Sequence, residues 1–577
     1  MSDLFMGISP AIPVVLAGLL AVILPWHYAR KVLMVLSPLA ALFLLLITPQ
    51  SGVYGVVEMA GLSFETYRLD NISRVWGLVF IIAAFLNGIY AWHEKDRMSD
   101  PSGLIYAGAG LGAVFAGDLL TLFFFWELTA ISSIFLIFAS RKGEAYRAGL
   151  RYLAISVLSG VLLLGGAVML YNTTGSWAFG GVGDVGVFSI DTPGGMLLFL
   201  AFGIKCAFPL LHNWLQDAYP KATATGAVVL SAFTTKLAIY ALARGFAGTE
   251  ILIWIGAIMT AFPVFFAVVE NDLRKVLAYS LNNQLGFMVC AIGVGSELAL
   301  NGAAAHAFVH IIYKGLLFMT MGAVLMRVGT TKASHLGGLY KSMPLTTVFC
   351  MIGGAAISAF PLFSGFVAKA LTLSAVLHEH HYIPWLILVF ASAGVLEHSG
   401  IKIPYCAFFG HDGGHKVKEA PFNMLLAMGL ASFLCLYLGI NYGALYNLLP
   451  YAVEYQPYTY DHVVGQMQLL LAALFAFTFL MRFKLYPAEK DITILDTDWI
   501  YRKVLDGAAR WSCAMLDRLG GAMDQGWAGL GRTIRKGLFN LFSPAGSFAR
   551  DVPSGIMAVW STLLLAVVLI VAYIYAS

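Results

Sequence analysis

Five lysines lie inside stretches of this sequence that are otherwise almost entirely apolar. Lys205 follows "GGMLLFLAFGI", and Lys236, Lys314 and Lys369 have apolar residues on both sides, whereas Lys402 lies near the end of its apolar segment. A charged side chain at the centre of a membrane-spanning helix costs about 2.5–3.5 kcal/mol on insertion scales. A desolvated lysine can release and regain a proton near neutral pH. The pattern therefore predicts proton exchange on buried amines.

Acids and histidines occur in the same kind of segment. Glu127, in "LLTLFFFWELTAISSIFLIF", is the natural counter-charge for a buried lysine, because moving a carboxylate towards or away from an amine switches the amine between loaded and empty. His212, His306 and His310 can extend a proton relay, since the unperturbed pKa of histidine is about 6.5. Glu397 is a further acid inside an apolar segment.

Other interpretations apply to some of these residues. Lys402 and Asp118 lie near segment ends, where a charged head can reach the membrane surface. His306 and His310 are spaced i, i+4, with Lys314 one turn on, which also permits a metal pair or haem ligation. No carboxylate or cysteine lies nearby in sequence, and the six cysteines show no ligand spacing. We predict neither a metal nor a cofactor.

The composition places all these residues in a membrane protein. Of 577 residues, 59% are hydrophobic and 11% are charged, against roughly 25% charged in soluble domains. The net charge of +4 and the lack of a basic cluster do not indicate nucleic-acid binding. No redox motif occurs, so we do not expect an enzyme that acts alone. Residues 9–26 lack the features of a cleaved signal peptide and are interpreted as a retained span.

Sixteen segments have the length and hydropathy of membrane spans. They are 8–26, 32–48, 75–92, 101–117, 119–139, 150–171, 194–215, 223–243, 250–269, 275–294, 299–326, 344–377, 383–408, 421–441, 464–481 and 554–576. Nineteen lysines and arginines follow odd-numbered spans, and three follow even-numbered spans. The positive-inside rule then predicts an outside N-terminus and cytoplasmic loops after odd-numbered spans.

Residues 496–543 have a different pattern. Apolar residues recur every three or four positions from Ile500 to Leu541, with charged residues between them. Asp496 or Thr497 can cap the start of a helix, and Pro544 ends it. The pattern predicts a long amphipathic helix lying along the cytoplasmic face. Seven glycines between residues 507 and 537 leave several short surface helices as an alternative.

Two proline-containing segments resemble each other. "CAFPLLHNWL" (206–215) in the seventh span and "SAFPLFSGFV" (358–367) in the twelfth both place a proline in mid-span after "AF". They lie five spans apart, and a five-span repeat must be inverted in the membrane because five is odd. Paired interrupted helices in inverted repeats indicate an ion pathway in transporters.

Longer segments identify a family resemblance. "FFFWELTAISSIFLI", "GIKCAFPLLHNWLQDAYPKATATGAVVLSAFTTKLAIYALAR", "NDLRKVLAYSLNNQLGFMV" and "HAFVHIIYKGLLFMTMGAVL" resemble the proton-translocating antiporter family. That family includes antiporter-like subunits of respiratory complex I, the D and A subunits of Mrp-type sodium/proton antiporters and membrane-bound hydrogenase subunits. The resemblance covers about residues 75–410.

The resemblance implies an all-α fold with a fourteen-helix core, two inverted five-helix repeats and broken helices 7 and 12. By position, it implies a proton path through one residue set: Glu127, Lys205, Lys236, His306, His310, Lys314 and Lys369. His212, Glu397 and Lys402 are possible additions. The implied regions are N-terminal helices (1–100), two repeats (101–243 and 250–408), C-terminal helices (421–481), a lateral helix (496–543) and a final span (554–576).

The C-terminal stretch and the thirteenth span need separate comparison with the family. "LDTDWIYRKV" (495–504) and the stretch after it resemble the tail of the distal complex I subunit, which carries a lateral helix. Overall the chain looks most like an Mrp-type D subunit with this tail added. The thirteenth span, with "GVLEHSGIKIPYCAFFGHDGGHK", carries more charge than the family pattern, so the exit pathway does not transfer there.

Three functions fit these observations. The first is a proton-translocating subunit of a multi-subunit Na⁺/H⁺ antiporter in the cell inner (plasma) membrane. The second is a proton-pumping subunit driven by a redox module, as in complex I or a membrane-bound hydrogenase. The third is a membrane partner of an inorganic-carbon uptake module. Other membrane subunits, protons and Na⁺ are the implied partners, and neighbouring genes distinguish the three.

Overall fold

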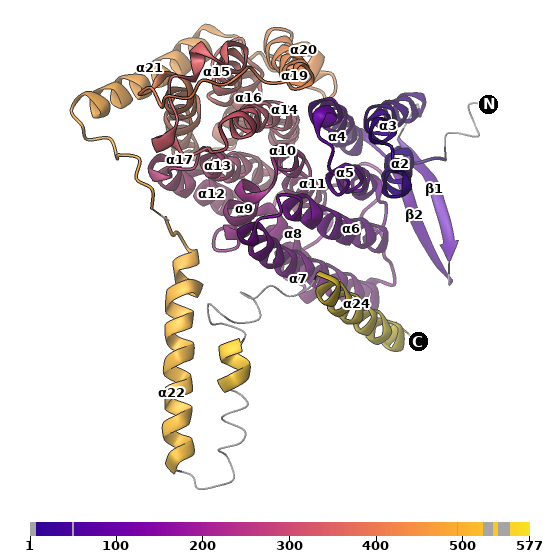
Figure 1. The fold of residues 1–577 in the computed structure, drawn as a ribbon. Helices are drawn as coiled ribbons and strands as arrows, with labels where there is room; N and C mark the ends of the chain where they lie inside the picture. Colours follow the sequence, from indigo (N-terminus) through magenta and orange to yellow (C-terminus); the bar gives the residue numbers. More distant parts are fainter. Residues whose placement is uncertain are drawn as a thin grey trace.

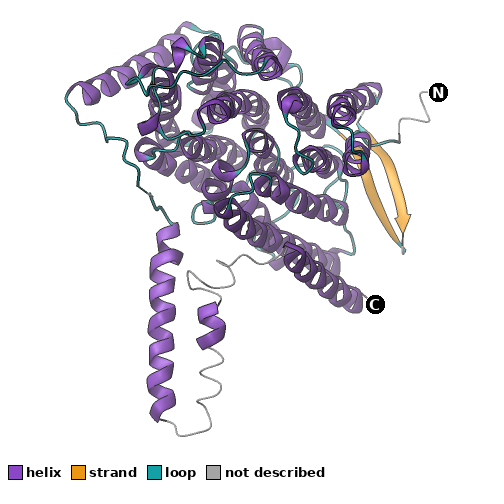
Figure 2. Ribbon diagram, viewed as in Figure 1, coloured by secondary structure: helices purple, strands orange, loops and turns teal. Residues whose placement is uncertain are grey.

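The structure is a computed structural model that describes residues 7–48, 51–59, 61–492, 494–522, 535–540 and 554–576. It is a helical membrane protein with one small β-hairpin (Figure 2). Within the described ranges, twelve helices are long and apolar enough to cross a membrane. Four shorter apolar helices accompany them: Ala11–Ile23, Pro193–Cys206, Pro344–Ile357 and Ser364–His378.

The helices follow the sequence pattern closely. The first third of the chain forms α2 (Ala11–Ile23), α3 (His27–Ile47), β1 (Gly52–Met59), β2 (Leu62–Leu69), α4 (Asn71–Tyr90), α5 (Ser99–Phe115), α6 (Leu119–Phe138) and α7 (Gly143–Thr174). The middle third forms α8 (Pro193–Cys206), α9 (Asn213–Ala218), α10 (Ala224–Ala232), α11 (Thr234–Phe246), α12 (Ile251–Val269), α13 (Leu273–Val294) and α14 (Glu297–Val328). Each predicted span in these regions contains a helix.

The last third continues the bundle and then leaves it. It forms α15 (Pro344–Ile357), α16 (Ser364–His378), α17 (Tyr382–Val395), α18 (Lys402–Pro404), α19 (Phe422–Ile440), α20 (Tyr442–Tyr446), α21 (Tyr460–Arg482), α22 (Asp506–Ala522) and α24 (Ser554–Ala576). In the thirteenth predicted span, α17 continues through π-helical turns at Leu396–Ile401 and Tyr405–Phe409. Such turns are frequent at functional sites.

The β-hairpin is an element that the sequence did not predict. Strands β1 and β2 pair antiparallel, with Gly52 opposite Leu69 and an irregular register around Gly55. Asp118 anchors the hairpin, because its carboxylate caps α6 at the Thr121 amide and also accepts a 2.7 Å hydrogen bond from the Glu65 amide. Asp118 is therefore a buried helix cap.

Three helical segments form the buried centre of the bundle. α13 and α14 are almost entirely enclosed, as is the segment formed by α10 and α11 (Figure 1). α12 packs closely on α13 because Gly256 faces the backbone of Gly286, where a Cβ atom would collide with main-chain atoms. Polar side chains in the middle of these central segments are enclosed by protein.

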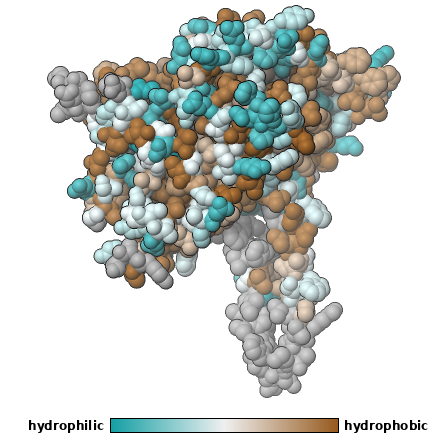
Figure 3. Space-filling view, turned by 180° about the vertical axis from the view of Figure 1, so that it is seen from behind, coloured by the Kyte–Doolittle hydropathy of each residue, from teal (hydrophilic) through white to brown (hydrophobic). Residues whose placement is uncertain are grey.

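Several charges at the helix ends are buried ion pairs. Asp100 of α5 binds both Arg30, at 3.1 Å, and Lys31, at 2.5 Å. Arg244, at the end of α11, binds Asp70 at 2.7 Å. These pairs hold the connecting segments against the bundle. The outer surface differs, and large hydrophobic patches lie open on it (Figure 3), as expected for a surface that faces lipid.

The C-terminal part contains helical segments within the range predicted as a lateral helix. Residues 500–505 form a π-helical turn, α22 continues to Ala522, and residues 535–540 are helical. The rest of the predicted range 496–543 lies outside the described residues. α22 extends away from the bundle, and α24 lies beside α7 (Figure 1).

Candidate functional site

Lys205 lies at a break in the seventh predicted span. α8 ends at Cys206, Ala207 and Leu210 have φ angles of 63° and 70°, and α9 begins only at Asn213. Pro209, between them, has no N–H to continue the helix. The sequence prediction of an interrupted helix here is confirmed.

The Lys205 ammonium group points at α6. Its Nζ atom donates hydrogen bonds to the Trp126 carbonyl oxygen, at 2.7 Å, and to Thr129 Oγ1, at 3.1 Å. It also lies 4.4 Å from the centre of the Trp126 ring, which is a cation–π distance. A neutral amine keeps two N–H groups, so both hydrogen bonds can persist when Lys205 loses its proton.

Glu127 is the neighbour of Trp126, but it does not contact Lys205. No ion pair within 4 Å joins the two side chains, although their charges are close enough to interact electrostatically. The Glu127 carboxylate packs against Gly160 of α7, and its Oε1 atom has no hydrogen-bond partner among the described residues. The predicted partnership is therefore an interaction across a gap.

Lys236 lies at a second break, which the sequence did not predict. α10 ends at Ala232, Phe233 has distorted helical dihedral angles (φ −103°, ψ −68°), and α11 begins at Thr234. The Lys236 Nζ atom turns back and donates a 2.6 Å hydrogen bond to the Ser231 carbonyl oxygen. The carbonyls at a helix end lack helical partners and carry partial negative charge, so they suit an ammonium group.

Lys369 repeats this arrangement in the twelfth predicted span. α15 ends at Ile357 and α16 begins at Ser364, while Ala359 and Leu362 have φ angles of 57° and 74°. The Lys369 Nζ atom donates a 2.8 Å hydrogen bond to the Ile357 carbonyl oxygen. The two "AFPL" segments thus have left-handed residues at equivalent positions, which confirms the second predicted break.

The polar stretch of α14 lies between the two broken regions in sequence. His306, His310 and Lys314 are all fully buried. His306 Nε2 lies 3.1 Å from both Gln284 Oε1 and the Tyr313 hydroxyl. Both ring nitrogens of His310 and the amine of Lys314 have no hydrogen-bond partner among the described residues. Buried polar groups without partners are costly in a folded protein, and in native proteins they often mark functional sites.

The sequence prediction did not single out three further buried polar residues: Gln284, Asn282 and His398. Gln284 is hydrogen-bonded to both His306 and Asn283, and Asn282 is buried beside them in the chain. The run "NNQ" inside a predicted span is the signal that could have indicated them. His398 is also fully buried, and it reaches Ser280 of α13 through the hydroxyl of Ser399.

The three additional candidates lie in different surroundings. Lys402 is buried, and its Nζ atom donates to the carbonyl oxygens of Val268 and Glu270 at the end of α12. Glu397, in the π-helical turn, is half-buried. His212 is fully buried at the end of the first break, where its Nε2 atom lies 3.3 Å from the Asp496 carboxylate. The Lys402 Nζ atom also lies 3.7 Å from the Glu489 carboxylate.

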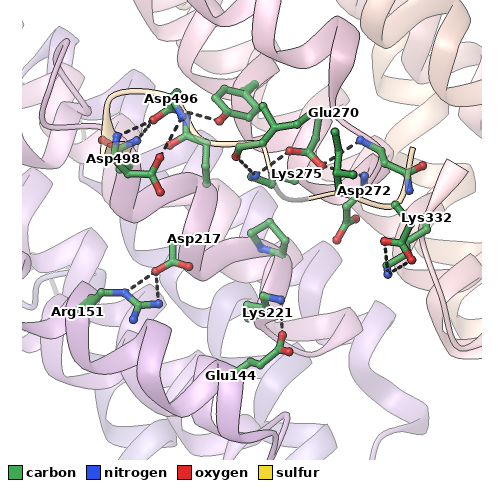
Figure 4. Close-up of a pocket in the computed structure, with 18 of the residues that line it drawn as sticks. Glu144, Arg151, Asp217, Lys221, Glu270, Asp272, Lys275, Lys332, Asp496 and Asp498 are labelled. Carbon is green, nitrogen blue, oxygen red and sulfur yellow. Dashed lines mark hydrogen bonds and ion pairs between the residues drawn. The ribbon is translucent and has the colours of Figure 1, made fainter. Parts of the chain in front are cut away.

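A polar cavity lies beside the first break, and we call it the vestibule. It has a volume of about 620 Å³ and is lined by three groups of segments. The first is the start of α7, and the second is the α9 region up to Lys221. The third combines residues around Asp491 and Asp496 with the loops at residues 270–275 and at residue 332. Ion pairs line it, including Arg151–Asp217, Lys221–Glu144 and Lys332–Asp491 (Figure 4).

The side-chain chemistry suits protons better than a bound metal. Over the described residues, no group of three His, Cys, Asp or Glu side chains is placed to hold a metal ion. The buried lysines and histidines instead offer nitrogen atoms that exchange protons, and the breaks offer carbonyl oxygens that accept their hydrogen bonds. The fold and the site therefore define a polytopic membrane protein with a buried chain of titratable groups.

Comparison with known proteins identifies the family. Residues 116–394 match the family described as NADH:quinone oxidoreductase/Mrp antiporter, transmembrane. The D subunit of the Na⁺/H⁺ antiporter of Alkalihalophilus pseudofirmus is 31% identical over 390 residues, which cover 64% of this chain and 77% of that protein. This chain belongs to that proton-translocating antiporter family.

Two further similarities cover more of the chain. The Na⁺/H⁺ antiporter's A subunit in the same organism is 28% identical over 498 residues, 75% of this chain, and the match spans only 61% of that relative. One chain in the structure of the membrane-bound sulfane sulfur reductase, an archaeal respiratory membrane complex, has a TM-score of 0.71 at 20% identity. That similarity covers 97% of this chain and 99% of the other, and it shows the fold.

Proposed function

We propose that this chain is the proton-translocating subunit of a multi-subunit monovalent cation/proton antiporter, with Na⁺ as the cation. One observation carries the proposal: the four buried lysines of the predicted path, Lys205, Lys236, Lys314 and Lys369, have no carboxylate of the described residues within 4 Å. Lys205, Lys236 and Lys369 are held by neutral oxygens, and Lys314 has no hydrogen-bond partner in the described part of the chain. Neutral acceptors bind both the charged and the neutral amine, so each lysine can change its protonation state without losing its position.

The proposed path uses the groups in the order that the family resemblance implies. Lys205, biased by the charge of Glu127, receives a proton from the side of the first break. Lys236 passes it towards His306, His310 and Lys314, and Lys369 releases it on the far side. His212 is the natural group for proton access, because it lies between the first break and the vestibule. Lys402 lies apart from this route and holds the end of α12.

The loop charges support an orientation of the chain in the membrane. We propose that the N-terminus lies outside the cell inner (plasma) membrane and that the vestibule faces the cytoplasm. Lys221, Lys275 and Lys332, which line the vestibule, all come from loops that follow odd-numbered predicted spans. The position of α22 supports contact with another membrane protein of the complex, since α22 points away from the bundle in Figure 1.

A redox-driven complex is the second candidate. The similarity to the sulfane sulfur reductase chain extends over nearly the whole of this chain, including the C-terminal region, and its fold therefore fits this function as well. The two candidates share the same proton path. They differ in the partner subunits, so exchange that depends on a Na⁺ gradient alone supports the antiporter, and exchange that requires electron transfer supports the redox complex.

Substitutions at Lys205 test the proton path. In vesicles that hold the whole complex, we expect Lys205→Ala to abolish proton transport, measured as dissipation of a pH gradient. Lys205→Arg should abolish it as well, because arginine keeps its proton in proteins, while complex assembly stays intact. Lys142→Ala, at an exposed lysine before α7, is the matched control. Wild-type transport by Lys205→Arg would show that Lys205 is only a structural cation.

A further inference from the structure

A segment from the far end of the sequence closes one side of the vestibule. Residues 494–499, which we call the C-terminal arm, follow α21 and precede the π-helical turn at Ile500. In Figure 4 the arm crosses the vestibule wall and carries Asp496 and Asp498 into it. Lys275 Nζ donates a 3.2 Å hydrogen bond to the Ile494 carbonyl oxygen, which fixes the start of the arm.

Asp496 is the residue that joins the arm to the bundle. Its side chain is 1% exposed, and its Oδ2 atom lies 3.3 Å from His212 Nε2 and 2.7 Å from the Tyr279 hydroxyl. Its Oδ1 atom accepts a hydrogen bond from the Asn213 side-chain amide. Every one of these partners can donate, so the site is built for a carboxylate anion.

The surroundings keep Asp496 ionised. Burial, the largest single influence, would raise the pKa of this carboxyl group, but the interactions with its neighbours, those with His212 first among them, together lower it more. The Tyr279 hydroxyl and a backbone amide add to this effect, so the pKa of Asp496 lies well below its usual range. At neutral pH Asp496 therefore holds a negative charge and does not itself carry the transported proton.

His212 has one occupied and one open nitrogen. Nε2 faces Asp496, whereas Nδ1 has no hydrogen-bond partner among the described residues. The ring packs edge-on against Phe262, with ring centres 4.6 Å apart, so it is held in one orientation. One turn further along the chain, Gln216 lines the vestibule with both amide atoms unpartnered within the described ranges, and it is 4% exposed.

We propose that Asp496 is a positioning residue that makes His212 the proton-loading group between the vestibule and Lys205, an inference that rests on the proposed function. The Asp496 carboxylate accepts Nε2–H and so leaves the lone pair on Nδ1. Nδ1 takes one proton from the vestibule side, and the anionic Asp496 stabilises the resulting imidazolium. The same proton leaves from Nδ1 towards Lys205. The Nε2 proton stays in place, so the charge and proton count of the pair return to their starting values.

The arrangement gives the C-terminal arm a role in the chemistry of proton transport. The loading group lies in the first broken helix, but its orienting charge comes from a segment 284 residues away in sequence. A purely mechanical anchor would need Asp496 only to hold the arm. The Tyr279 hydroxyl also hydrogen-bonds Asp496, and this bond holds the arm without involving His212. A change at Tyr279 therefore tests the anchoring role separately from the role of orienting His212.

The first experiment removes the charge and keeps the shape. In vesicles that hold the whole complex, we expect Asp496→Asn to lower the initial rate of proton transport roughly tenfold or more, the range for loss of a charge-assisted hydrogen bond. Asp461→Asn is the matched control, because Asp461 is an exposed aspartate in the first turn of α21, away from the residues that line the vestibule. We expect its rate to stay within about twofold of wild type. Wild-type transport by Asp496→Asn would overturn the proposal.

The second experiment separates positioning from anchoring. If Asp496 acts through His212, Asp496→Asn should cause no further loss in a His212→Asn background, whereas independent effects multiply. Tyr279→Phe removes an anchoring hydrogen bond and should retain most of the wild-type rate. Multiplying losses in the double variant, or a Tyr279→Phe rate as low as that of Asp496→Asn, would show an anchor only.

The outcomes for Lys205 keep this proposal distinct from the proposed function. If Lys205→Ala abolishes transport while Asp496→Asn does not, the proton path stands and the role of Asp496 is wrong. If transport survives Lys205→Ala, the proton path itself is wrong.

Discussion

A single methyl group at Gly160 tests whether the position of the Glu127 carboxylate matters. Gly160 of α7 leaves the space that this carboxylate occupies. A Cβ atom at Gly160 would overlap Glu127 Oε1 and lie 2.5 Å from its Cδ atom, although real Cβ contacts are essentially never under 3.0 Å. The variant Gly160→Ala must therefore move the carboxylate, by roughly 1 Å on this geometry. Folding should tolerate the change, because the end of a flexible side chain moves and alanine favours a helix by about 1 kcal/mol over glycine.

The magnitude follows from the charge interaction with Lys205. The two groups form no ion pair within 4 Å, so we take a separation of about 5 Å. At an effective dielectric constant of about 20, their interaction is about 3.3 kcal/mol at about 5 Å and about 2.8 kcal/mol at about 6 Å. The difference of about 0.5 kcal/mol corresponds to a change of two- to threefold in the proton equilibrium of the pair. We expect the transport rate to fall by at least that factor.

The assay is proton transport in vesicles that hold the whole complex, with assembly checked on the same preparation. Gly165→Ala is the matched control, because it adds the same methyl group to the same helix and meets only Leu197 Cδ1, at 3.7 Å, among the described residues. We expect the control to transport like wild type. Equal rates for Gly160→Ala and Gly165→Ala, in assembled complexes, would refute the idea that the Glu127 position sets the rate.

Three further predictions address topology, assembly and pH. Gly143→Cys and Ser176→Cys, at exposed positions flanking α7, should be labelled from the cytoplasm and from outside respectively, and labelling of both from one side would contradict the loop-charge orientation. Deletion of 496–577 should weaken assembly with other membrane subunits, seen by native electrophoresis, while the bundle still inserts; an unchanged complex would exclude a bracing role. Because its folded-state pKa is lowered, Asp496 should stabilise docking of the C-terminal arm fully above the ordinary aspartate pKa of 3.8 and lose this effect as the pH falls below it. The distance between spin labels at Ile492→Cys and Gly143→Cys should therefore lengthen only in acid, and lengthening above pH 5 would contradict the sign.

Local sequence determined where the helices lie. A span is recognised from the hydropathy of about 20 consecutive residues, so each of the sixteen predicted segments contains a helix. The boundary at 117–118 also lies where the sequence placed it, because Asp118 caps α6. The two "AFPL" segments determined their own breaks, since proline removes a backbone donor and the residues around it adopt left-handed conformations.

Sequence also indicated which titratable groups would be buried, because an apolar segment of spanning length carries its lysines into the membrane with it. It did not indicate what those lysines bind. The carbonyl oxygens of Trp126 and Ile357 are main-chain atoms, which carry no sequence signal, and the break at Phe233 contains neither glycine nor proline. The separation of Glu127 from Lys205 depends on how α6, α7 and α8 pack together.

Only the tertiary structure brought the C-terminal arm against the first broken helix. The sequence offered Asp496 or Thr497 as a helix cap, because caps are local and both residue types commonly precede a helix. The contact of Asp496 with His212 spans 284 residues and depends on the route of the chain after α21, which no local pattern encodes. The hairpin at β1 and β2 was missed for a related reason, since its pairing depends on anchorage by Asp118 outside the strands. Membrane insertion is decided segment by segment, whereas the partners of a buried charge are decided by packing across the whole bundle.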